Sequence, residues 1–141
     1  MNKKYNIRYI ENKDLDIIHS WWIKRDEDPI ERDLLPQGGL GGLMIEKDSI
    51  RIAACFIYLT NSKMGYIDHL ISNPDYKGKG FWHYDLMKAC FKAAKKSGCS
   101  DVWGTSSVRG VVRLLERYGC EISEDPHYII WPRWINNKQH G

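Results

Sequence analysis

The distribution of apolar and polar residues along the chain predicts a series of short strands. Apolar or alternating stretches, separated by turn residues, indicate strands over 6–10, 43–46, 49–60, 64–71, 101–105 and 128–131. The second and third of these form a hairpin across Lys47-Asp48. From Ile52 to Ile57 both faces of the strand are apolar, so we expect it in the middle of a sheet that is covered on both sides.

Apolar residues that recur every three or four positions predict helices around these strands. One helix begins near Asp14, where Asn12 can cap it, and Pro29 can open a short second helix. Two longer amphipathic stretches follow over 80–97 and 111–118. We therefore expect an α+β fold with three layers (α/β/α), in which helices flank a mixed, largely antiparallel central sheet.

Length and composition fit one globular domain over 1–135, followed by a flexible tail over 136–141. The 21 basic and 18 acidic residues nearly cancel, and the net charge of +3 does not indicate a dedicated nucleic-acid or membrane binder. The apolar runs are too short to span a bilayer, and the first residues lack the apolar core of a signal peptide. The cysteines are widely spaced, so we expect free thiols in a reducing cytoplasm and no metal site.

The segment from Tyr66 to Gly98 carries the clearest chemical signal. It contains a strand, a turn at Pro74, a Lys-Gly-Lys-Gly loop over 77–80 and an amphipathic helix. Backbone N–H groups at the start of a helix can point at a phosphate, and the helix dipole favours the negative charge there. The two lysines in the loop add positive charge. The segment therefore predicts binding of a phosphorylated ligand.

The predicted order of elements, β-α-α-β-β-β-α-β-α-β with a glycine loop after the fourth strand, resembles the GNAT superfamily of acyl-CoA N-acyltransferases. The family signature is Arg or Gln, two residues, Gly, one residue, and Gly or Ala, placed after a strand and a proline. The run from Ser72 to Trp82 is similar to it. A second family pattern, a helix that ends in Gly-Phe, is similar to the run from Leu114 to Cys120. Together, these motifs and the order of elements also resemble small acetyltransferase-like proteins of bacteriophages.

This resemblance implies transfer of an acetyl (acyl) group from acetyl-CoA to a primary amine, with coenzyme A as co-substrate and no metal. The loop amides would hold the pyrophosphate, and the strand before the loop would pair with the pantetheine arm. Ser106 is a further candidate contact to the thiol or pantetheine, although a serine at a helix start is commonly a cap. The candidate cofactor-binding residues are Ile71, Ser72, Lys77, Gly78, Lys79, Gly80, Phe81, Trp82 and Ser106.

Three positions depart from the family pattern. Lys77 replaces Arg or Gln and keeps the positive charge. Trp82 replaces the Gly or Ala that lets the cofactor approach, and Leu115 replaces a tyrosine that protonates the departing thiolate. The last two departures motivate an alternative hypothesis: a GNAT-like binding module, catalytically weak or inactive, that acts through a protein partner.

Two residues are candidates for acid–base catalysis. An amine with a pKa of about 10.4 is almost entirely protonated at pH 7, so a base assists its attack on a thioester. Asp68 lies on the strand that leads into the loop, where many family members carry an acid, and is the predicted base or water relay; a structural ion pair is the alternative. Tyr118, one turn after Leu115, is the candidate proton donor, and core packing is the alternative.

The stretch over 26–33 holds five carboxylates at the place where the family builds its acceptor-binding lip. Such a lip would favour a cationic amine, on a small molecule or on a protein, and a solvated helix start is the alternative. A nucleic-acid binder would use the lysine stripe Lys88, Lys92, Lys95 and Lys96, but the small net charge opposes this hypothesis. We expect no membrane partner, and a monomer or homodimer.

Overall fold

The structure is a computed structural model of the chain, and it describes residues 5–78, 80, 82–104 and 109–122. Its strands are β1 Asn6–Tyr9, β2 Gly42–Lys47, β3 Ile50–Leu59, β4 Met64–Ser72 and β5 Asp101–Gly104. Its α-helices are α1 Leu15–Lys24, α2 Trp82–Lys96 and α3 Arg109–Tyr118. Short 3-10 turns occupy Asn12–Asp14, Arg32–Leu34 and Pro36–Gly39.

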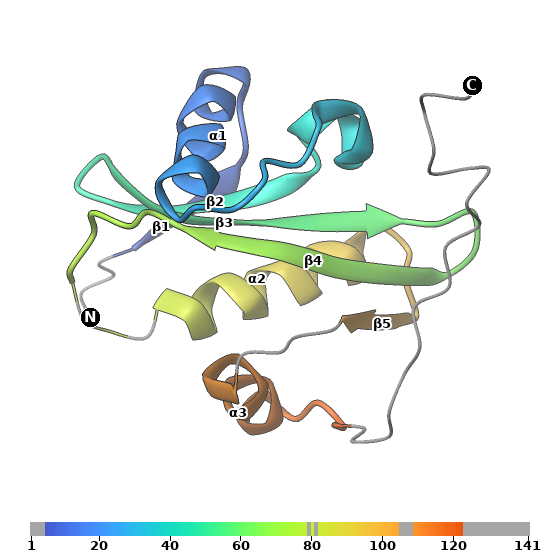
Figure 1. Cartoon of the computed structure of the whole chain (residues 1–141). Helices are drawn as coiled ribbons and strands as arrows, with labels where there is room; N and C mark the ends of the chain where they lie inside the picture. Colours follow the sequence, from blue (N-terminus) through green and yellow to red (C-terminus); the bar gives the residue numbers. More distant parts are fainter. Residues whose placement is uncertain (1–4, 79, 81, 105–108, 123–141) are drawn as a thin grey trace.

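The described strands form one sheet in the order β1-β2-β3-β4-β5. Each neighbouring pair is antiparallel except β4 and β5, which run parallel. Helix α1 lies on one face of the sheet, and α2 and α3 lie on the other (Figure 1). The prediction of a three-layer fold with a mixed, largely antiparallel sheet is therefore confirmed.

Strand β3 is the apolar centre of this sheet. Its alternate residues Ala53, Cys55 and Ile57 belong to the core under α2, whereas Ala54 and Phe56 belong to the core under α1. All of them are buried. A strand with two apolar faces needs a helix layer on each side, so the expectation for this strand is confirmed.

The structure differs from two local predictions. The hairpin turn falls at Asp48-Ser49, one residue later than predicted, and both residues have positive φ, as the type I′ turn requires. No helix begins at Pro29: residues 27–31 have no regular structure, and the short turn starts at Arg32. The wider stretch over 26–33 contains five carboxylates and little apolar surface to pack, which explains its lack of an α-helix. The predicted strand over 128–131 and the tail over 136–141 lie outside the described residues.

A buried carboxylate fixes the start of α1 against the sheet. Asp14 is fully buried and accepts hydrogen bonds from Arg8 at 2.8 and 3.0 Å, from Arg51 at 2.6 Å and from the amide of Glu11 at 2.7 Å. Burial alone would raise the pKa of Asp14, but these donors outweigh it and hold the pKa well below its usual range. The ion cluster therefore joins α1 to β1 and β3.

Replacing this carboxylate is expected to destabilise the protein strongly. Asp14→Asn leaves two partly buried guanidinium groups without their counter-charge, and breaking a buried pair in this way costs about 3–5 kcal/mol. Urea unfolding at pH 7 measures the change. Asp16→Asn, at an exposed position in the first turn of the same helix, is the matched control and should change stability by less than about 0.5 kcal/mol.

The pH dependence provides a second measurement on the same pair of proteins. Because the pKa of Asp14 is lowered on folding, its contribution is complete above the unfolded-state pKa of about 3.9 and is lost as the pH falls toward the lower folded-state pKa. Below about pH 4 the gap in stability between the natural protein and the Asp14→Asn variant should therefore narrow. A gap that stays constant down to pH 2 would contradict this role.

Candidate functional site

Strand β4 pairs with β3 along its length, but on its other side the described pairing covers only its first residues. It pairs with β5 from Met64 to Ile67, where the described pairing ends at Gly104. It pairs with β3 as far as Ser72, and the amide of Asn73 continues the ladder to Ile52 at 2.7 Å. Within the described residues, the end of β4 after Ile67 therefore has a ladder on one side only.

A β-bulge lies at this point of β4. Phe56 of β3 pairs with Asp68, but Ala54 pairs with Ile71, so two residues of β4 face a single residue of β3. His69, the first of the two, has a φ of 59°, a left-handed conformation that costs about 1 kcal/mol in a residue with a side chain. The extra residue also reverses the faces: Ile67 packs under α2, whereas Ile71 packs under α1. In a regular strand, two residues four positions apart share a face.

Asp68 lies directly at the bulge and is partly exposed. Its carboxylate accepts a hydrogen bond from the Tyr66 hydroxyl at 2.9 Å and from the amide of His69 at 2.7 Å. The His69 side chain is 3.9 Å from the same carboxylate, so the ion pair considered from the sequence is present when the imidazole is protonated. The carboxylate is thus held in place and remains 29% accessible to solvent.

The glycine loop between β4 and α2 is packed against tyrosine hydroxyls. A Cβ atom at Gly78 would collide with the hydroxyl of Tyr76, and a Cβ atom at Gly80 would collide with that of Tyr5. Gly80 also has a φ of 141°, which favours glycine. These two positions therefore require glycine for space. Lys77 is exposed, and Lys79 and Phe81 lie outside the described residues.

Trp82 does not cover the loop. It begins α2, is 8% exposed and packs in the core under that helix with Leu86 and Cys90. Its ring stacks on His83, with ring centroids 3.4 Å apart, and burial lowers the pKa of His83. The sequence suggested that Trp82 could obstruct a cofactor. Its place in the core removes the observation that most favoured an inactive binding module.

The end of α1 holds the loop in place, a role that the sequence did not reveal. Arg25 donates to the carbonyl of Ser72 at 3.0 Å and to its hydroxyl at 2.7 Å. Lys24 forms a salt bridge of 3.1 Å with Asp75. In the sequence, these contacts are marked only by a pair of basic residues at a helix C-terminus. Such a pair is usually explained by its favourable interaction with the helix dipole.

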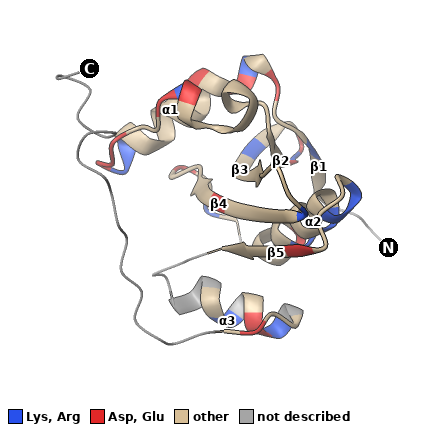
Figure 2. Ribbon diagram, turned by 90° about the vertical axis from the view of Figure 1, so that its right-hand side faces the viewer, with Lys and Arg blue, Asp and Glu red and all other residues tan. Residues whose placement is uncertain are grey.

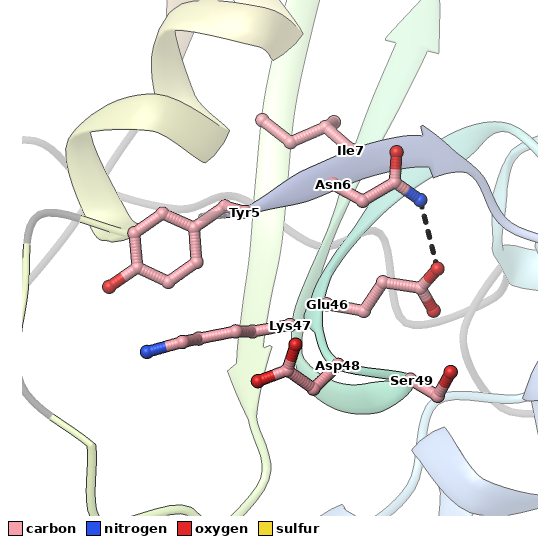
Figure 3. Close-up of a pocket in the computed structure, with 7 residues that line it drawn as sticks. All are labelled: Tyr5, Asn6, Ile7, Glu46, Lys47, Asp48 and Ser49. Carbon is pink, nitrogen blue, oxygen red and sulfur yellow. Dashed lines mark hydrogen bonds between the residues drawn. The ribbon is translucent and has the colours of Figure 1, made fainter. Parts of the chain in front are cut away.

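A shallow hollow lies beside Tyr5, the residue whose hydroxyl packs at Gly80. It is lined by the first residues of β1 and by the β2–β3 turn (Figure 3). In this view the Tyr5 ring and the Lys47 side chain extend in the same direction, and the Lys47 ammonium lies 6.0 Å from the ring centroid. Burial and the neighbouring Tyr76 and Asp85 raise the pKa of Tyr5, so its hydroxyl stays protonated. Lys47 thus brings a cation near the glycine loop.

The remaining candidates lie on or beside α3. Leu115 packs partly buried against the core under α2. Tyr118 is the last residue of α3, but its side chain is outside the described part of the structure, as is Ser106. Asp68 thus lies on β4 at the bulge, and the described part of the glycine loop follows the end of that strand; the predicted roles of these residues, of Tyr118 and of Ser106 stay predictions.

Charge and ligand chemistry narrow the possible functions. Basic and acidic residues alternate around α1 and along α3 in Figure 2. Among the described residues, no group of three or more His, Cys, Asp or Glu side chains is arranged to hold a metal ion. The described helices are also too short or too polar to cross a bilayer.

Comparison with known proteins identifies the fold. The sequence matches no protein-family model and no curated protein. A GCN5-related N-acetyltransferase from Ralstonia eutropha superposes with a TM-score of 0.64 at 18% identity, over 89% of this chain and 98% of that one. A predicted acetyltransferase from Clostridium acetobutylicum, solved with acetyl-CoA, gives 0.61 at 16% identity, over 94% and 98% of the two chains.

N-acetylglutamate synthase from Neisseria gonorrhoeae, complexed with coenzyme A and L-arginine, superposes with a TM-score of 0.64 at 18% identity. The match covers 82% of this chain but only 27% of the synthase, so the chain spans about a quarter of that protein. The chain has the GNAT acyl-CoA N-acyltransferase fold, as the sequence resemblance implied.

The contacts of Arg25 lead to a prediction about the loop. Arg25→Gln should speed hydrogen exchange at the amides of Asn73, Asp75 and Tyr76 by about fivefold, because it removes about 1 kcal/mol of charge-assisted hydrogen bonding. Lys24→Gln is the matched control. Its salt bridge to Asp75 is more than half exposed on both sides and should contribute less. Equal exchange in the two variants would contradict the role of Arg25.

Proposed function

We propose that this protein is an N-acetyltransferase that moves an acetyl group from acetyl-CoA to a primary amine by direct attack. The observation that carries the proposal is the end of β4, which within the described residues has a ladder on one side only and leads into a glycine loop at the N-terminus of α2. The fold of structures solved with coenzyme A or acetyl-CoA supports the same conclusion.

The residues present fit a phosphorylated co-substrate. The hydroxyls of Tyr76 and Tyr5 fill the space that a Cβ would take at Gly78 and Gly80, so the loop keeps this path to the start of α2 only with glycine at both positions. The exposed Lys77 and the start of α2 add positive potential there. We assign the pyrophosphate to the loop over 77–82 and the pantetheine arm to the backbone of Ile71 and Ser72. Bound in this way, acetyl-CoA supplies an activated thioester.

Asp68 is the proposed base. The acceptor enters as an ammonium, and its proton passes to the Asp68 carboxylate, directly or through water. The neutral nitrogen then forms a bond to the thioester carbonyl carbon, the carbon–sulfur bond breaks and the thiolate leaves, while the nitrogen gives up its second proton to water. A thiol has a pKa of about 8.5, so this leaving group departs without full protonation. Tyr118 remains the candidate donor of a proton to it.

The proposed acceptor is a primary amine on a small molecule. The five carboxylates over 26–33 are exposed beyond the end of α1 and favour a cationic acceptor. We place the reaction in the cytoplasm, in keeping with the free thiols of the described cysteines.

Binding of acetyl-CoA tests the proposal. Isothermal titration should show micromolar binding to the natural protein, and Gly80→Asp should abolish it through steric block and charge repulsion. Gly38→Asp is the matched control, since Gly38 also has positive φ but has no heavy atom within 4 Å of its Cβ position. Thermal unfolding checks that both variants fold. No heat and no thermal shift with the natural protein would refute the proposed function.

Removal of the base tests the mechanism. Asp68→Asn should lower kcat by about 10²–10⁴-fold, the usual contribution of a general base, while the Kd for acetyl-CoA changes less than about twofold. Turnover is measured by the release of the coenzyme A thiol. Tyr66→Phe removes the 2.9 Å hydrogen bond but keeps the carboxylate, so its kcat should fall far less. An Asp68→Asn enzyme with the natural kcat would rule out this base.

A further inference from the structure

A row of aromatic rings crosses the sheet next to Asp68. The Trp103 and Tyr66 rings lie with centroids 4.6 Å apart, and Tyr66 lies 6.0 Å from Tyr58. The ring of His69 completes the row, 5.8 Å from Tyr58. Trp103 comes from β5 and Tyr58 from β3, and Tyr66 and His69 both come from β4. We call these four residues the aromatic row.

The aromatic row lies on the α1 face of the sheet. Tyr58 pairs with Tyr66 across β3 and β4, and Tyr66 pairs with Trp103 across β4 and β5, so these side chains share one face. Tyr58 packs against the core under α1, which identifies that face. Trp103, at the outer end, is 49% exposed. A large indole on a described sheet edge is therefore open to a ligand.

Asp68 places a negative charge beside this row, and an acidic segment of the chain reaches it at Leu34. Asp68 is hydrogen-bonded to the Tyr66 hydroxyl at 2.9 Å and is within 3.9 Å of the His69 imidazole. The Tyr58 hydroxyl donates to the carbonyl of Leu34 at 3.2 Å, which brings the segment after α1 to the row. That segment carries five exposed carboxylates: Asp26, Glu27, Asp28, Glu31 and Asp33.

The electrostatic effect on Tyr58 agrees with this arrangement. Burial, together with the charges of Asp68 and Tyr66, raises the pKa of Tyr58 to about 12. A second negative charge beside Asp68, that of a deprotonated Tyr58, is thus disfavoured. The same field favours a cation, and ring faces attract one as well, by about 0.5–1 kcal/mol when exposed and about 2 kcal/mol when desolvated.

We propose that the aromatic row and Asp68 form the acceptor subsite, and that it selects an ammonium group carried on an apolar stem, such as an alkylamine or arylalkylamine. This inference rests on the proposed function, because it places the ammonium beside the base that removes its proton. Trp103 and Tyr66 contact the cation or its stem, and Asp68 receives the proton before the nitrogen attacks. Acceptors with a carboxylate near the amine are disfavoured by Asp68 and the acidic segment.

Choline and its neutral isostere 3,3-dimethylbutan-1-ol test the subsite without any reaction. Choline has no proton on nitrogen to lose, so its binding reports recognition alone. NMR titration should show choline bound about five- to thirtyfold more tightly than the alcohol, because a cation–π interaction of about 1–2 kcal/mol corresponds to that ratio. Trp103→Leu should remove the preference. Tyr9→Leu, at another exposed aromatic position on the opposite edge strand, is the matched control and should keep it.

Turnover and acetyl-CoA titration on the same samples separate the outcomes. With 2-phenylethylamine as acceptor, kcat/KM should exceed that with L-glutamate by at least about tenfold, and Trp103→Leu should raise the KM for the amine without a matching loss in kcat. Equal binding of the two isosteres while acetyl-CoA still binds overturns the subsite alone. If acetyl-CoA does not bind, the proposed function fails, and the assignment of an acceptor subsite fails with it.

Discussion

The two-sided pairing of β4 is the constraint on which the site depends. The strand must stay in the ladder with β3 through Ser72, yet its pairing with β5 ends at Ile67 in the described residues. The bulge at His69 accommodates both demands, since it bends the strand and moves Ile71 to the other face. Among the described residues, the backbone groups of β4 after Ile67 therefore have strand partners on one side only, and backbone N–H and C=O groups are strong hydrogen-bonding groups that need partners. A ligand with amide groups along an extended arm suits such an edge.

Helix α1 fixes this edge from its two ends. Asp14 joins its start to Arg8 and Arg51, so the helix sits at a set angle on the sheet. Arg25 then reaches from its last turn to Ser72. The cluster around Asp14 is buried, whereas the contact of Arg25 is exposed. The start of α1 is therefore held by buried ion pairs, whereas its C-terminal end is held by an exposed contact.

The sequence was sufficient for the main elements and for the location of the glycine loop, because hydrophobic periodicity is local. It was not sufficient for features that depend on long-range contacts. Nothing in Asp68-His69-Leu70 marks a bulge, since bulges of this conformation usually carry glycine, not histidine. Likewise, the direction of Trp82 depends on the core beneath α2, and the partner of Arg25 lies far along the chain. Pro29 was misread because a helix-starting residue cannot form a helix without an apolar face to bury.

The central claim is that the end of β4 and the glycine loop bind one co-substrate together. A crystal structure of the protein grown with acetyl-CoA tests it most directly. The account predicts density for the pantetheine arm against the backbone of Ile71 and Ser72, and for the pyrophosphate on the loop over 77–82, with the thioester next to Asp68. Acetyl-CoA bound at any other surface, or an edge closed by another part of the chain at saturating acetyl-CoA, would contradict it.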